Sequence, residues 1–127
     1  MMAYLDTTPV FLDSANFRSA LAAAGAFHDA SIESIKIYNG RLAIELDRPY
    51  FPAERRYAVG GISGAILNIV LTSTEIDLCA LRAAAEEYRI FEMSFDEGES
   101  RLSILFEDGY FTNFAIDPRN STFSWSR

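Results

Sequence analysis

The most specific chemical feature of the sequence is His28 followed directly by Asp29. An imidazole beside a carboxylate titrates near neutral pH, and such a pair can transfer protons. We expect the pair between the first helix and the first strand, where side chains can face solvent. The alternative interpretation is structural: both side chains hydrogen-bond to nearby backbone and fix the helix-to-strand turn. The pair is therefore a candidate contact for a ligand or partner, with the structural interpretation preferred.

Residue counts argue against metal chemistry. His28 is the only histidine and Cys79 the only cysteine, whereas ordinary zinc sites combine several such ligands. Asp96, Glu97 and Glu99 cluster in one expected turn, but they lack the full spacing of a calcium loop. We therefore predict no metal, no cofactor and no catalytic residue.

A glycine-rich stretch, residues 60–64, is the next candidate for chemistry. A phosphate loop needs a following Lys and Ser/Thr, and a nucleophile elbow needs a strand before its serine and a helix after it. Here a strand is expected after Ser63, so we predict a turn or a bulge. Cys79 is expected near the start of a helix as a small buried side chain.

Arginine and aromatic residues gather in the loop after the first hairpin. Arg55, Arg56 and Tyr57 follow Tyr50 and Phe51 closely in the chain. Arginine and tyrosine are enriched among the residues that dominate protein interfaces. The loop is therefore a candidate contact surface, and the alternative is that it packs against the edge of the sheet.

Two helices are predicted from caps and spacing. Asp13 is the expected N-cap of a short helix with an apolar stripe, and Gly25 is the expected residue that ends it. Thr74 and Asp77 form a capping box that opens a second helix through about residue 87.

A hairpin is predicted around the dipeptide 39–40, Asn-Gly, which favours a tight two-residue turn. In the register that this turn sets, Ile35 faces Ile44, so the apolar sides of both strands coincide. In the same register Glu33 and Glu45 point to opposite faces, which argues against an acid–base pair.

The remaining strands follow from alternation and turn residues. Residues 62–72 are β-rich and apolar on both faces, which predicts a central strand covered on both sides. Further strands are expected near 90–95, 102–106, 110–116 and 123–125. The fold class is therefore α+β: one domain, 1–127, with a mainly antiparallel sheet of about six or seven strands and two helices packed on one face.

The net charge of −7 is unevenly distributed. Ten acidic residues and three arginines lie between Glu75 and Asp108, so the whole surplus lies there. Nucleic acids and anionic membranes are disfavoured as partners, and a basic protein is favoured. The charge-free stretch 58–74 contains three glycines and is interpreted as a turn and a strand rather than a membrane span. No targeting signal is recognised, so a cytoplasmic location is expected.

One segment resembles known families. The sequence FHDASI at 27–32, followed by the strand pattern at 34–35 and 42–46, resembles the opening of several families of small bacterial proteins. In these an FHDA-like turn leads into a first β-hairpin. Most are uncharacterised, and some are grouped as immunity proteins of contact-dependent or polymorphic toxin systems. The resemblance implies a small bacterial protein with a binding role.

Three functional hypotheses follow. The first is a protein-binding module, for example an immunity-type protein, that covers a basic partner. The second is a small ligand-binding domain or enzyme with His28 and Asp29 at the mouth of a pocket. The third is a homo-oligomeric structural protein, because an uncovered sheet face or edge needs a partner.

Overall fold

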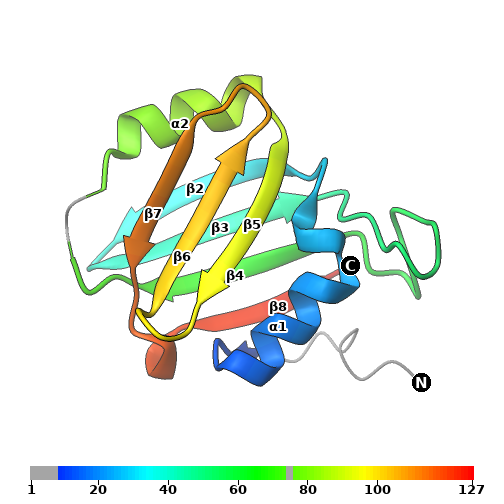
Figure 1. The fold of residues 1–127 in the computed structure, drawn as a ribbon, viewed down its shortest axis with the longest axis horizontal. Coiled ribbons are helices and arrows are strands. Elements are labelled where there is room, and N and C mark those ends of the chain that lie inside the picture. The colour runs from blue at the N-terminus through cyan, green and yellow to red at the C-terminus, as the bar shows by residue number, and fades with distance from the viewer. Residues whose placement is uncertain (1–8, 74–75) are drawn as a thin grey trace.

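The computed structural model of the protein describes residues 9–73 and 76–127 (Figure 1). Within these residues the strands are β1 (Val10–Phe11), β2 (Ser31–Tyr38), β3 (Arg41–Asp47), β4 (Gly64–Val70), β5 (Ile90–Asp96), β6 (Arg101–Phe106), β7 (Phe111–Ala115) and β8 (Thr122–Ser126). The helices are α1 (Ser14–Ala23) and α2 (Leu78–Glu87), with short 3₁₀ turns at η2 (Gly25–Phe27) and η3 (Pro118–Asn120). In this part of the chain, neither α-helix is long and apolar enough to cross a membrane.

The strands form two antiparallel sheets. One sheet has five strands in the order β1-β8-β4-β3-β2, and the other has three in the order β5-β6-β7. The α+β class and the mainly antiparallel pairing are confirmed. The single sheet with both helices on one face is not what is found: the smaller sheet lies over the larger one (Figure 1), while α1 lies against β5 and β1 and α2 against β2.

The core lies between the two sheets. Side chains from the inner face of the larger sheet, such as Ile44, Leu67 and Phe123, are almost completely buried. Leu102 and Ile104 from the smaller sheet are buried with them in one continuous cluster. Burying this apolar surface is the main force that holds the two sheets together.

The helix ends follow local rules. The Asp13 side chain accepts a hydrogen bond from the Asn16 amide at 2.8 Å, so the predicted N-cap of α1 is confirmed. α2 begins one residue after Asp77, whose side chain accepts from the Ala80 amide at 3.0 Å. Asp77 is thus the N-cap itself and not the third helical residue of a capping box. Thr74, the expected cap, lies outside the described residues.

The first hairpin has the predicted register beside its turn, where Ile35 pairs with Ile44. Further along, a β-bulge between Ile32 and Ser34 adds one residue to β2, so Ile32 and not Glu33 pairs with Leu46. The expectation that Glu33 and Glu45 point to opposite faces is therefore wrong. A bulge shifts the alternation by one residue from that point onward.

β4 is central, as predicted, because it pairs with β3 on one side and β8 on the other. It is covered on one face only: Leu67 is fully buried, whereas Asn68 on the opposite face is exposed. The last strand does not extend the hairpins before it. Instead β8 crosses to the larger sheet and pairs between β1 and β4.

Candidate functional site

The FHDA segment forms an unusual turn. Gly25, Ala26, Phe27 and Asp29 all have positive φ values, between 57° and 69°. Such values are costly for residues other than glycine and persist only where surrounding contacts hold them. Phe27 supplies such a contact, since its buried ring lies 6.1 Å from that of Trp125.

The polar groups of His28 and Asp29 are engaged with β5. His28 Nδ1 lies 2.8 Å from the carbonyl oxygen of Phe91; a carbonyl only accepts, so Nδ1 carries the hydrogen. The Asp29 amide donates to the Ile90 carbonyl at 2.8 Å, and the Ile90 amide donates to the Ala30 carbonyl at 2.9 Å. These bonds join the start of β2 to the start of β5, and hence one sheet to the other. They favour the structural interpretation of the pair.

The two side chains also face each other. His28 Nε2 lies 3.7 Å from Asp29 Oδ2, and both side chains are partly exposed. The imidazole ring packs edge-on against the Phe91 ring, with centroids 5.3 Å apart. A groove of about 580 Å³ lies elsewhere, lined by Phe11, Leu12, Asp13, Phe95, Glu97, Pro118 and Arg119. The pocket expected beside His28 under the enzyme hypothesis is not this one.

Residues 48–63, named here the arginine–tyrosine loop, bring the other candidate residues together. The guanidinium carbon of Arg48 lies 4.7 Å from the centre of the Tyr57 ring, a cation–π contact. Tyr50 packs edge-on against the same ring, with centroids 5.1 Å apart. Sequence reasoning grouped the two tyrosines correctly but missed Arg48, which the structure adds to them.

Phe51 anchors this loop to the core. It is fully buried, and its ring lies 5.2 Å from that of Trp125 on β8. The Phe51 amide donates to the Arg56 carbonyl at 2.8 Å, which closes the chain between them into a short antiparallel bridge. Phe51 is therefore a supporting residue of the loop and not part of its exposed surface.

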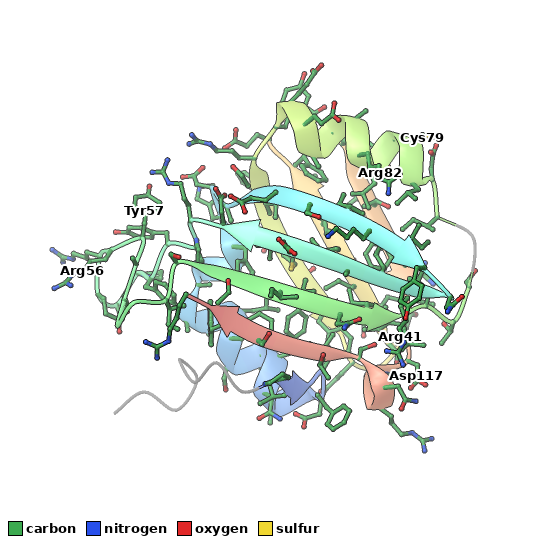
Figure 2. The ribbon with its side chains drawn as sticks, turned by 180° about the vertical axis from the view of Figure 1, so that it is seen from behind. Arg41, Arg56, Tyr57, Cys79, Arg82 and Asp117 are labelled. Atoms are coloured by element: carbon green, nitrogen blue, oxygen red, sulfur yellow. The ribbon has the colours of Figure 1, made fainter. Side chains whose placement is uncertain are left out.

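The exposed surface of the loop is basic. Arg55 and Arg56 are exposed, and neither forms an ion pair with another residue of the described part of the chain. Arg127 reaches the loop from β8, where it donates to the Gly60 carbonyl at 3.4 Å. With Arg48, four of the eleven basic residues lie on or against this loop. Figure 2 shows Arg56 and Tyr57 beyond one end of the larger sheet.

Two further sequence predictions meet the structure here. Gly60 and Gly61 have φ values of 60° and 82° between the bridged residues Val59 and Ile62, so the predicted glycine turn is confirmed. Cys79 is exposed on α2, so the prediction that it is buried is wrong. It does not share the apolar stripe that faces the core, to which Leu81 belongs.

Acidic side chains meet where β2 and β3 come closest to the loop. The bulge brings Glu33 near Asp47 and Glu45, and repulsion, chiefly from Asp47, raises the pKa of Glu33 above its ordinary value of 4.5. Within residues 9–73 and 76–127, no group of three or more His, Cys, Asp or Glu is arranged to hold a metal ion. A side-chain hydrogen bond between Glu33 and Asp47 also contributes to the raised pKa of Glu33.

Comparisons of the chain with protein-family models, with curated proteins and with solved structures found no match.

Proposed function

We propose that this protein is a protein-binding module whose contact surface is the arginine–tyrosine loop. The observation that carries the proposal is a pair of exposed arginines without ion pairs, Arg55 and Arg56, in the same loop as the packed cluster of Arg48, Tyr50 and Tyr57. Arginine and tyrosine in this combination dominate the energetics of many interfaces.

The packing of the loop supports this role. Because the Tyr57 ring already contacts both Arg48 and Tyr50, it loses little conformational freedom when a partner covers it. Tyr57 is 42% exposed, so its ring already offers apolar contact area. The buried Phe51 keeps the loop in place without contributing to the surface.

The charge of the loop indicates the chemistry of the partner. Guanidinium groups bind carboxylates with two parallel hydrogen bonds, so Arg55 and Arg56 suit a protein surface rich in Asp and Glu. The acidic surplus between residues 75 and 108 suits a basic partner instead, and it belongs to another part of the chain. The two expectations concern different surfaces.

A binding role is also what the resemblance of residues 27–46 to small bacterial proteins, some of them immunity proteins, implies. For His28, the hydrogen bond from Nδ1 to the Phe91 carbonyl fixes the tautomer and ties the ring to β5, as the structural interpretation expects. One imidazole nitrogen thus remains for any proton transfer.

The experiment is affinity capture from the native cell lysate, comparing wild type with Arg55→Glu/Arg56→Glu. The matched control is Arg89→Glu/Arg119→Glu, which changes the net charge equally at two exposed positions outside the loop. We expect one acidic protein to be captured by wild type and by the control, but not by the loop variant. Equal capture by both variants would refute the role of the loop, and no specific capture by wild type would refute the binding function in that cell.

A further inference from the structure

The outer face of the five-stranded sheet has opposite charges at its two ends. Lys36 and Arg41 lie at one end, on β2 and β3. Glu33, Glu45 and Asp47 lie toward the other end, on the same two strands. Figure 2 looks onto this face, with Arg41 at one end and the arginine–tyrosine loop at the other, and no described element lies in front of it. Between the ends stand small or uncharged side chains: Ser34, Ala43, Ile66, Asn68, Thr122 and Ser124.

Within the described residues, no salt bridge is seen for the charged groups on this face. The Arg18–Glu97 ion pair and the His28–Asp29 contact involve other parts of the molecule. A hollow of about 440 Å³ opens at the basic end, lined by Lys36, Tyr38, Arg41, Ala43 and Asn68. The face therefore has a basic recess at one end and a crowded acidic cluster at the other.

We propose that two copies of the chain pair face to face through this surface, about a two-fold axis that runs across the strands. A second copy is the occupant because the face is complementary to itself. In such an isologous contact each residue of one copy meets its counterpart in the other. The proposal concerns a surface distinct from the arginine–tyrosine loop and does not depend on the function proposed above.

The register of the strands fixes which residues would meet. The cross-strand rows run from Tyr38–Arg41 through Lys36–Ala43 and Ser34–Glu45 to Ser31–Asp47. A two-fold axis between the two middle rows lays β2 of one copy over β2 of the second copy, and β3 over β3. The paired strands run in opposite directions, so the basic end of one copy covers the acidic end of the other. Arg41 then lies over Asp47 of the second copy, and Lys36 lies over Ser34 and the bulged Glu33. An axis parallel to the strands would instead place like charges together, which is unfavourable.

The size of the face predicts a weak dimer. Strands β2, β3, β4 and β8 with the short β1, at about 4.8 Å spacing and about 3.3 Å per residue, give a patch of roughly 24 by 20 Å. Two copies would bury on the order of 1,000 Å², the lower limit for a specific interface. The small side chains in the middle of the face allow the sheets to approach to the usual distance of about 10 Å. A cation from the second copy would also relieve the repulsion that raises the pKa of Glu33.

The test is sedimentation equilibrium of the purified full chain over a range of concentrations, at low and at high salt. We expect a monomer–dimer equilibrium that salt weakens, because the contacts are between surface charges. Lys36→Glu and Glu33→Lys each replace two attractive contacts per dimer by repulsive ones. Two attractive charge pairs are lost and two repulsive pairs are gained, so four surface-pair energies change. The dissociation constant of the dimer should therefore rise roughly thirtyfold in each variant. Both positions are exposed, and circular dichroism checks that the variants fold.

An equal mixture of the two variants is the decisive sample. In a mixed dimer every exchanged contact is attractive again, so we expect the mixture to dimerise about as well as wild type. Arg55→Glu/Arg56→Glu should dimerise like wild type, which separates this result from a test of the loop. A monomer under all conditions, an assembly larger than a dimer, or a mixture no better than its components would overturn the proposal.

Discussion

Replacing Phe51 by Ala tests whether the arginine–tyrosine loop is anchored as described. Phe51 is fully buried, and burying a phenylalanine side chain contributes about 2.5 kcal/mol. The ring pair with Trp125, at 5.2 Å, adds about 1 kcal/mol. We therefore expect Phe51→Ala to lower the free energy of unfolding by about 3.5 kcal/mol, within the usual range for such truncations. For a chain of this size the melting temperature should fall by roughly 10–20 °C.

Urea unfolding followed by tryptophan fluorescence measures this directly. Trp125 is the only tryptophan and is 3% exposed, so its emission reports on its contact with Phe51. The variant should show red-shifted emission in its native state as well as a lower midpoint. Phe111→Ala is the matched control, because Phe111 is 54% exposed, and its effect should stay within about 0.5 kcal/mol. A loss below about 1 kcal/mol for Phe51→Ala, with unshifted emission, would refute this packing.

Two further predictions concern polar groups. Ser121 is fully buried, and its hydroxyl donates to the Asp117 carbonyl at 2.7 Å and accepts from the Val70 amide at 2.8 Å. Ser121→Ala leaves that amide without its partner and should cost about 1–3 kcal/mol in urea unfolding, so a neutral result would contradict the contact. The pKa of Glu33 is higher in the folded protein than in the unfolded chain. Protonated Glu33 therefore stabilises the fold below the unfolded pKa, and this stabilisation is lost as pH rises through the folded pKa. Glu33→Gln should therefore raise the melting temperature at neutral pH but not well below pH 4.5, and an equal shift at both would exclude the charge as the cause.

Local patterns predicted the parts of the fold that depend on neighbours in sequence. The Asn39–Gly40 turn gave the hairpin register, and the Asp13 carboxylate gave the start of α1. Both depend on backbone geometry within a few residues. The Glu33 bulge could not be predicted in this way, since the bonds that join Asp29 and Ala30 to Ile90 fix the chain just before β2.

The division into two sheets was also beyond local patterns. Alternation shows that a segment is a strand but not which strand it pairs with. β8 follows η3 in sequence, yet it crosses to the five-stranded sheet because Phe123 and Trp125 fill the core beside Phe27. The open outer face of β4 has a related cause. Ile66 is apolar, so the sequence predicts that it lies in a core, but the second sheet covers only the opposite face of β4.

The candidate site was predicted where its residues are close in the chain. Tyr50, Phe51 and Tyr57 lie within eight positions, so one loop had to hold them. Arg127 is distant in sequence, and no signal in the sequence links it to Gly60. Cys79 was misplaced because residue type was weighed above helical spacing, which sets it apart from the buried Leu81.

The most direct test of the binding function is photo-crosslinking in the native cell from a photoreactive phenylalanine analogue placed at Tyr57. The same analogue at Tyr88 is the control, because the two tyrosines are similarly exposed, at 42% and 38%, and Tyr88 lies outside the loop. We predict a discrete crosslink to an acidic protein from position 57 that is absent from position 88. No crosslink from position 57, or the same crosslinks from both positions, would contradict the arginine–tyrosine loop as the contact surface.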